Sequence, residues 1–166
     1  MATVLELAWA AGILDGEGCI SIVRFNPPKG SPLASPRHVL HVKVTMGHRP
    51  TVERLLAILG VGSIQHHVSR SSRVNASYSY IVQSRLADGV LQTLRPFLIT
   101  KAEEADLALA FAALPLGPRG GGGGGAPLPL AILEVRDRYH WELRKLKPRW
   151  RFYAAKMRKE GIPFPE

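Results

Sequence analysis

Two carboxylates near the amino terminus occupy a position that favours cation binding. The stretch AWAAGILDGEGCI, Ala8–Ile20, begins with good helix formers and then places Asp15 and Glu17 among glycines. A helix that ends here carries partial negative charge on carbonyl groups that have no intrahelical partner. Acids added to that end repel it unless a cation binds between them. Oxygen ligands of this kind suit Mg²⁺, which keeps part of its water shell and binds phosphate oxygens.

Small residues precede the acids and would allow two copies of this helix to pack closely. Ala8, Ala11 and Gly12 leave room for the backbone of a second helix. Two such copies would bring their carboxyl ends together, each with a free carbonyl near Gly16 and with Glu17 just beyond. The alternative is that Glu17 is a solvated acid that follows a glycine helix cap.

The charge of the chain is concentrated in its middle. The formal net charge is +9, and residues 19–101 hold eleven lysines and arginines against only Glu53 and Asp88, together with five of the six histidines. A basic excess in one contiguous region indicates a polyanionic partner, most often nucleic acid. A generally basic protein without such a partner is the alternative.

Length and composition narrow the class of protein. A chain of 166 residues predicts one domain with a substantial core. The single cysteine, Cys19, excludes an internal disulfide and a zinc site built on cysteine pairs. The start lacks the basic region of a signal peptide and no apolar run reaches membrane-spanning length, so we expect an intracellular protein whose compartment, organellar or prokaryotic, stays open.

The first helix and four strands must position these residues. Thr3 and Glu6 predict a capping box for a helix from about Val4 to Asp15, which Gly16 or Gly18 ends. Alternating β-branched segments predict two strand pairs: CISIVRF with RHVLHVKVT across the turn NPPKGSPLASP, and GSIQHHVSR with YSYIVQSR across SSRVNAS.

Further helices complete the order of elements. Pro50 opens the helix TVERLLAILG, which Gly60 ends, and later helices are LADGVLQTL, AEEADLALAFAAL and LAILEVRDRYHWELRKL. The fold class is therefore α+β, with a four-stranded antiparallel sheet. We expect a core at residues 1–114, a flexible Gly/Pro-rich linker at 115–129 and a C-terminal helical extension at 130–166. The tail KPRWRFYAAKMRKEG predicts a docked amphipathic helix or, alternatively, a clamp on a DNA backbone.

The motif at the first helix end resembles a known family. AAGILDGEG, Ala10–Gly18, resembles the nonapeptide of the LAGLIDADG homing endonucleases, with Ala10, Gly16 and Glu17 as its departures. LGVGSI and the segment LRPFLITK, which ends at Lys101, resemble the single-motif, homodimeric branch, and the likeness covers about residues 4–113. It implies a saddle-shaped sheet with helices on one face and hydrolysis of phosphodiester bonds in double-stranded DNA.

The resemblance also implies the site residues. Glu17 and the Gly16 carbonyl would hold Mg²⁺, with Mn²⁺ or Ca²⁺ as other occupants, and Lys101 would stabilise charge on the phosphate. Met46 stands where the family often has a polar residue that positions water, with Thr45 or His48 as substitutes.

The implied dimer brings together one face of the first helix. Because one chain supplies one acid cluster, we expect a homodimer on a pseudo-palindromic target. Its predicted interface consists of Leu7, Ala8, Ala11, Gly12 and Asp15.

Strand parity, counted from the motif, predicts which side chains face the major groove. They are Ser21, Val23, Phe25, Arg37, Val39, His41, Lys43, Gln65, His67, Ser79 and Ile81. Further candidates are Arg24, Arg70, Arg73, Tyr78 and Tyr80, although Arg24 has the opposite parity, Tyr80 is also consistent with a core residue and Arg70 with a solvated turn.

Two other functions remain open from the sequence. A protein of the same fold that binds without cutting, an intron-splicing maturase or a DNA-binding regulator, is favoured by Met46. The acid at Glu17 and the presence of Lys101 favour the nuclease. An RNA-binding module is disfavoured, because no strand face shows a conspicuous pair of aromatic residues.

Overall fold

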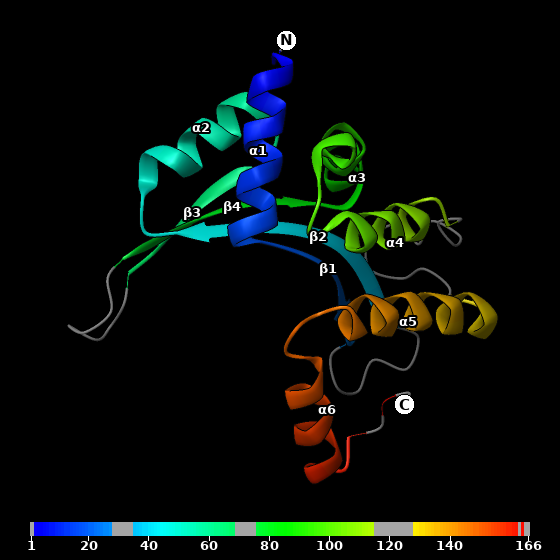
Figure 1. Cartoon of the computed structure of the whole chain (residues 1–166). Helices are drawn as coiled ribbons and strands as arrows, with labels where there is room; N and C mark the ends of the chain where they lie inside the picture. Colours follow the sequence, from blue (N-terminus) through cyan, green and yellow to red (C-terminus); the bar gives the residue numbers. More distant parts are fainter. Residues whose placement is uncertain (1, 28–34, 69–75, 115–127, 163, 165–166) are drawn as a thin grey trace.

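The order of elements is the one that the sequence predicts (Figure 1). The computed structural model describes residues 2–27, 35–68, 76–114, 128–162 and 164. Its elements are α1 (Val4–Glu17), β1 (Gly18–Phe25), β2 (Arg37–Met46), α2 (Arg49–Leu59), β3 (Ser63–His67), β4 (Ser77–Gln83), α3 (Ser84–Leu94), the short 3₁₀ helix η1 (Arg95–Phe97), α4 (Ala102–Ala112), α5 (Leu130–Lys145) and α6 (Trp150–Lys159). The predicted turns at 28–34 and 69–75 and the glycine run at 115–127 lie outside the described residues. No helix in the described part of the chain is long and apolar enough to cross a membrane.

The four strands form one antiparallel sheet in the order β1-β2-β4-β3. Gly18 pairs with Val44 in the first hairpin, and Val44 pairs in turn with Tyr80, so β2 joins the two hairpins. Both outer strands, β1 and β3, directly precede their hairpin partners along the chain, which keeps the pairing local. The α+β class with an antiparallel four-stranded sheet is therefore confirmed.

The helices α1 to α4 all lie on one face of this sheet (Figure 1). Every second strand residue points to them, and Ile20, Val42 and Val44 are at most 1% exposed. They pack against Leu14 of α1 and Leu91 of α3 in a single core. The same alternation leaves the other strand residues on the opposite face, where β3 is largely exposed.

Both ends of α1 are set by local chemistry. The Thr3 backbone N–H donates to Glu6 Oε2 at 2.9 Å and the Glu6 N–H donates to Thr3 Oγ1 at 3.3 Å, which is the predicted capping box. The helix runs two residues beyond the predicted Asp15, because the Gly18 N–H still bonds to the Leu14 carbonyl. Gly18 has extended backbone angles rather than a left-handed cap conformation, and it ends the helix.

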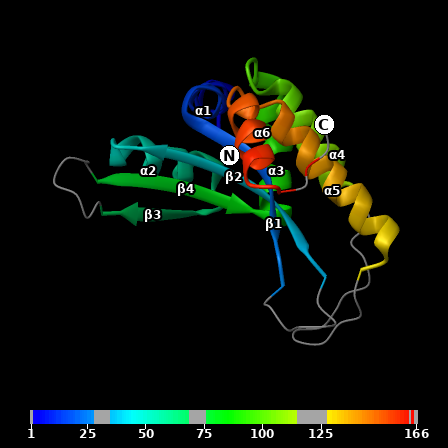
Figure 2. The ribbon, with the colours of Figure 1, turned by 90° about the horizontal axis from the view of Figure 1, so that it is seen from below.

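Figure 2 shows the C-terminal helix α5 next to α4. This helix docks on the core through polar contacts and through Leu143, which is 1% exposed. His140 Nδ1 lies 2.6 Å from the Ile22 carbonyl of β1, to which it donates. His38 Nε2 of β2 donates to Asp137 Oδ1 of α5 at 2.7 Å, and Arg24 Nε donates to the same oxygen at 2.9 Å. The division at 115–129 into core, linker and extension stays a prediction.

The tail helix α6 follows α5 and is amphipathic. Ala154 and Met157 are buried, whereas Phe152 is 70% exposed and Tyr153 is 40% exposed. The docked amphipathic helix expected for the tail is thus confirmed. Its use as a clamp on DNA stays a prediction.

Burial keeps two histidines neutral at the contact between α5 and the sheet, namely His38 of β2 and His140 of α5. Burial lowers the pKa of His38, and the opposing effect of Asp137 is smaller. Burial likewise lowers the pKa of His140, and the Ile22 carbonyl only partly offsets it. The rings lie 6.1 Å apart, and His38 Nδ1 has no hydrogen-bond partner within the described chain. Three cations act on this pair and disfavour protonation, Arg24 and Arg136 on His38 and Arg144 on His140.

We therefore expect acid to loosen the docking of α5. Below the ordinary histidine pKa of 6.5 the unfolded chain binds protons that the folded chain does not, so the free energy of unfolding falls as the pH drops. Each histidine contributes at most about 1.4 kcal/mol per pH unit. Urea unfolding followed by circular dichroism at about pH 7.5 and about pH 5.5 measures the loss.

The control keeps the hydrogen bonds and removes the titration. His38→Gln with His140→Asn retains an amide donor at each position and should reduce the pH dependence, whereas His67→Gln, an exposed position, should not. An equal pH slope in all three proteins would contradict the proposed role of burial.

Candidate active site and nucleic-acid interface

The carboxyl end of α1 presents an exposed acid. Glu17 is the last residue of the helix and is exposed, as is Gly16. Within the described chain, no hydrogen bond or ion pair engages the Glu17 carboxylate. Because the last carbonyls of a helix lack intrahelical partners, this end is negative from both the backbone and the side chain.

Asp15 is engaged by backbone groups of its own chain. Its Oδ2 accepts the Ile99 N–H at 2.8 Å and the Thr100 N–H at 3.2 Å, and its Oδ1 accepts the Lys101 N–H at 2.8 Å. Burial raises the pKa of Asp15, but these three hydrogen bonds and the positive charge of Lys101 act against it, so the pKa lies below its usual value. The interface role predicted for Asp15 did not include this contact, which joins α1 to the loop before α4.

Lys101 reaches the same helix end. It is the N-cap residue of α4, and its Nζ donates to the backbone carbonyl of Asp15. A cation at a helix amino terminus is unfavourable, and here the Asp15 carboxylate on the same backbone offsets it. The structure thus brings the Lys101 ammonium to the last turn of α1, the turn that also contains Gly16 and Glu17.

Thr45 and Met46 point to opposite faces of the sheet. Met46 is half-buried and packs against the core, on the side of the helices. Thr45 is exposed on the other face, with its Oγ1 2.8 Å from Ser79 Oγ. Thr45 follows Val44, which pairs with Gly18, the residue after Glu17. Of the predicted pair, Thr45 has the polar side chain, whereas Met46 packs against the core.

His48 does not replace Met46 in this structure. Its Nδ1 lies 2.8 Å from Thr51 Oγ1, at the start of α2 where His48 is the N-cap residue. This contact directs the ring to its own helix.

The sheet face away from the helices is polar, basic and free of acids. Paired positions place the predicted groove-facing residues together on it, among them Ser21 opposite His41 and Phe25 opposite Arg37. With Thr45 and the flanking strand positions, this face comprises Cys19, Ser21, Val23, Phe25, Arg37, Val39, His41, Lys43, Thr45, Ser63, Gln65, His67, Ser77, Ser79, Ile81 and Gln83. Burial, and secondarily the charge of Lys43, lower the pKa of His41, so this ring is neutral.

Two of the predicted DNA contacts lie on the wrong side for this face. Tyr80 is completely buried in the core and its hydroxyl donates to the Val61 carbonyl at 2.9 Å, so the prediction of a DNA contact at Tyr80 is wrong. Arg24 points toward α5, where it pairs with Asp137. Arg24 has the opposite parity to the groove-facing residues of β1. Since this strand has no bulge between Gly18 and Phe25, Arg24 lies on the side of the helices.

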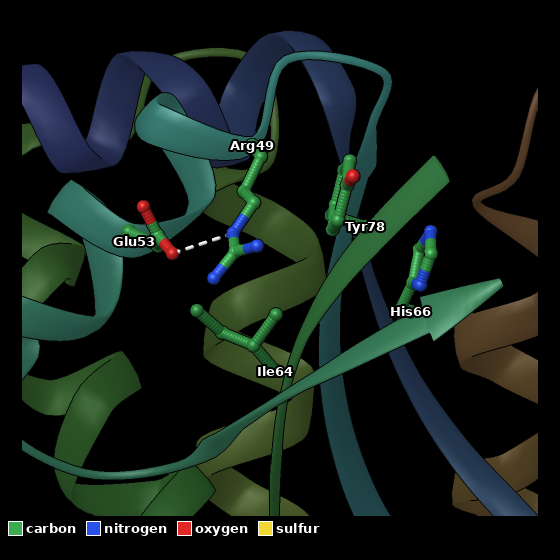
Figure 3. A pocket seen from close by; sticks show the side chains of 5 residues that line it. All are labelled: Arg49, Glu53, Ile64, His66 and Tyr78. Atoms are coloured by element: carbon green, nitrogen blue, oxygen red, sulfur yellow. Dashed lines mark hydrogen bonds and ion pairs between the residues drawn. The ribbon is translucent and has the colours of Figure 1, made fainter. Parts of the chain in front are cut away.

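Tyr78 also lies on the side of the helices. Its ring stacks on His66, with centroids 4.7 Å apart and planes at 7°, and the Arg49 guanidinium lies 5.8 Å from the centroid of the Tyr78 ring (Figure 3). Arg49 in turn donates to Glu53 at 2.7 Å. These residues line a shallow pocket with Ile64 beneath them. Tyr78 is therefore not part of the basic sheet face, and Arg70 and Arg73 lie outside the described residues.

The outward side of α1 is apolar and carries little bulk. Leu5 is 83% exposed, and Ala8 and Gly12 are exposed on the same side. A Cβ atom added at Gly12 would meet nothing within 4 Å, so the fold of one chain does not require glycine there. Ala11, by contrast, is 0% exposed and belongs to the core of its own chain, which contradicts its predicted side-chain contact across a dimer. Leu7 is half-buried against that core.

Solved structures with this arrangement of elements are DNA-cutting proteins. I-CvuI in complex with its target in the presence of calcium superimposes with a TM-score of 0.67 at 18% identity, over 96% of this chain and 97% of that chain. I-CvuI with the I-CreI target in the presence of magnesium, with the DNA not cleaved, gives 0.66 at 19% identity over 87% and 83%. An archaeal intron-encoded homing endonuclease complexed with DNA gives 0.63 at 19% identity over 86% and 84%.

The chain has the LAGLIDADG homing endonuclease fold. At these identities the likeness is one of fold. No protein-family model matches the sequence, and no curated protein matches it.

In this LAGLIDADG homing endonuclease fold, one chain offers an incomplete set of metal ligands. The described residues contain no cluster of three His, Cys, Asp or Glu side chains that could hold a metal ion. Glu17 and the Gly16 carbonyl are hard oxygen donors at a negative helix end, and they fit Mg²⁺ or Ca²⁺. They fill only part of a coordination shell, so water, phosphate oxygens or a second copy must supply the rest.

Sequence reasoning missed the residues that dock α5. His38, Asp137 and His140 hold α5 against the strands, but His38 lies 99 positions from Asp137 and no recognisable pattern links them. The amide contacts of Asp15 had one usable signal, namely a cation at the start of α4 that needs a nearby acid.

The glycines at the end of α1 should differ in their tolerance of alanine. A Cβ atom at Gly18 would lie 2.3 Å from Leu14 Cδ1 and 2.5 Å from the Leu14 carbonyl, whereas one at Gly16 would meet nothing within 4 Å. Gly18→Ala is expected to lower the free energy of unfolding by about 1–3 kcal/mol. Gly16→Ala should be neutral or slightly stabilising. Urea denaturation of both variants tests this, and equal effects would show that the overlap with Leu14 is relieved without cost.

Proposed function

We propose that this protein is a site-specific endonuclease that hydrolyses both strands of a DNA duplex with a divalent metal, as a homodimer on a pseudo-palindromic target. The observation that carries the proposal is the position of Glu17 and Lys101 at one helix end, next to a sheet face without acids. The DNA-bound structures of the same fold support it.

Recognition would use the basic sheet face. Arg37 and Lys43 supply positive charge toward the duplex, and the neutral ring of His41 with Gln65 supplies hydrogen-bonding groups for base edges. Val23, which is half-buried and pairs with Val39 across β1 and β2, would offer apolar contact to thymine methyl groups. A face that mixes charges with neutral donors and apolar groups is suited to sequence readout as well as to phosphate attraction.

The dimer would form through the outward side of α1. One chain supplies one exposed Glu17 carboxylate at the end of α1, while cutting two strands needs two reaction centres. Ala8 and Gly12 would let the α1 helices of two copies approach closely, and this would place their Glu17 ends side by side.

Each residue of the centre would have a distinct task in hydrolysis. Glu17 and the Gly16 carbonyl would hold the metal, which when bound polarises the scissile phosphate. The Lys101 ammonium would stabilise negative charge that develops on the phosphate oxygens. The Thr45 hydroxyl would orient the attacking water. A P–O bond to the leaving sugar oxygen breaks, a P–OH bond forms, and that sugar oxygen takes up a proton.

A second candidate, a binder of the same fold that does not cut, rests on one observation. Met46 turns an apolar side chain to the core where a polar residue was expected, so the water-positioning group depends on Thr45 alone. A maturase or a DNA-binding regulator would keep the sheet face and need no such group.

Neutralising the acid separates the two candidates. Glu17→Gln should lower the cleavage rate of a plasmid that carries the cognate site by about 100-fold or more, because the metal loses its charged ligand. The dissociation constant for the duplex in Ca²⁺ should change by less than about threefold, because sheet contacts supply the affinity. Glu134→Gln, an exposed acid on α5, is the control and should cut normally. Undiminished cutting by Glu17→Gln would exclude the metal role, and a wild-type protein that binds without cutting would favour the second candidate.

Bulk on the outward side of α1 should dissociate the dimer. Gly12→Leu has room within one chain and gains helix propensity, so the subunit should still fold. Sedimentation velocity should then find a monomer. Gly89→Leu on α3 is the matched control, since Gly89 is also exposed, helical and without neighbours within 4 Å, and it should remain dimeric. A dimeric Gly12→Leu protein would exclude this interface.

A further inference from the structure

The loop that carries Lys101 has few anchors of its own. Between η1 and α4, Leu98 is buried at 5% exposure, whereas the next residue, Ile99, is 86% exposed. The following two positions turn their backbone N–H groups toward α1, where the Asp15 carboxylate accepts them. The path of residues 99–101 thus depends on one buried apolar side chain and one carboxylate.

Asp15 and Lys101 contact each other at two points. The carboxylate of Asp15 fixes the main chain of Lys101 through its N–H, at 2.8 Å. The main-chain carbonyl of Asp15 accepts a hydrogen bond from the Lys101 ammonium. Both ends of the lysine are therefore held against the last turn of α1, although 86 positions separate the two residues in the sequence.

The two acids of the motif have different surroundings and therefore different capacities. The Asp15 oxygens already accept three N–H groups, which leaves about one of the roughly four acceptor positions of a carboxylate for a metal ion or for water. Glu17, two residues on, is exposed and engages no side chain or backbone group among the described residues. Only Glu17 is available for chemistry on DNA.

We propose that Asp15 is a positioning residue, which acts through Lys101 by holding its ammonium at the acidic end of α1 and does not touch the DNA. This inference rests on the proposed endonuclease function, because the task of Lys101 belongs to that reaction. Its physical content is a requirement of distance: an ammonium held against the helix end is at the centre, while one on a released loop samples the solvent. Displacing a reacting group by about 1 Å can lower a rate by about 100-fold.

A double-mutant cycle on the full-length protein tests the coupling. Asp15→Asn keeps the shape but turns an amide NH₂ toward backbone donors, and it should lower the single-turnover cleavage rate by about 10- to 100-fold. The dissociation constant for the cognate duplex should stay within about twofold. In the Lys101→Ala background the same substitution should change the rate by less than about twofold, because the group that it positions is gone. Full additivity of the two losses would overturn the proposal, as would normal cutting by Asp15→Asn.

A matched control and a second variant address folding. Asp88→Asn on α3 removes a carboxylate that accepts from Gln92 at 3.0 Å, and its cleavage rate should equal that of the wild type. If Asp15→Asn lowers the folded fraction, Asp15→Ser keeps one side-chain acceptor at the position, and the cycle is repeated with it.

A measurement without cleavage separates this proposal from the proposed function. Amide hydrogen exchange of residues 99–101 should be fast in Asp15→Asn and slow in the wild type and in Lys101→Ala, whose backbone donors keep their acceptor. Fast exchange in the wild type would overturn the positioning role. If the wild-type protein proved unable to cut DNA, the endonuclease proposal would fail, while the exchange result would still decide whether Asp15 holds the loop.

Discussion

The negative end of α1 is the constraint on which the other features of the structure depend. Its free carbonyls and Glu17 place charge of one sign at a point where no residue of the helix itself can neutralise it. Lys101 lies on a loop distant in sequence and donates its ammonium to a carbonyl of this helix end. Asp15 holds that loop by accepting its backbone N–H groups. Gly18 lets β1 begin directly after the helix, because a larger residue there would overlap Leu14. A negatively charged point is thereby fixed at the border between the helical layer and the open sheet face.

Periodic and local features of the sequence were sufficient for most of the fold. The capping box at Thr3, the helix stop at Gly60 and the alternation along RHVLHVKVT are all present as predicted, because each depends on residues within a few positions of one another. The same parity placed Ser21 and His41 on one face. The assignment of Lys101 and Glu17 to one site was predicted from the family resemblance alone, since no local rule links residues that far apart.

Contacts between distant segments could not be read from the sequence. Tyr80 has the parity of the core, but a tyrosine on a basic sheet is equally consistent with DNA contact until its hydroxyl is seen to bond to Val61. Asp137 and His140 look like surface residues of a polar helix, and only the docking of α5 buries His140 against β1 and brings Asp137 to His38. The backbone partners of Asp15 carry no side-chain signature, because any residue type other than proline at 99 and 100 provides the same N–H groups.

The alternation of the strands separates what must be conserved for folding from what is free to diverge. Core positions such as Val42 and Val44 admit little change, whereas Arg37 or Gln65 on the open face contributes little to the packing of the helices. Under the proposed function, a gene for such a protein would therefore accumulate changes in base preference without loss of a folded subunit. A change of DNA target would then proceed by exchange of residues on the open face, one position at a time, while α1 stayed as it is.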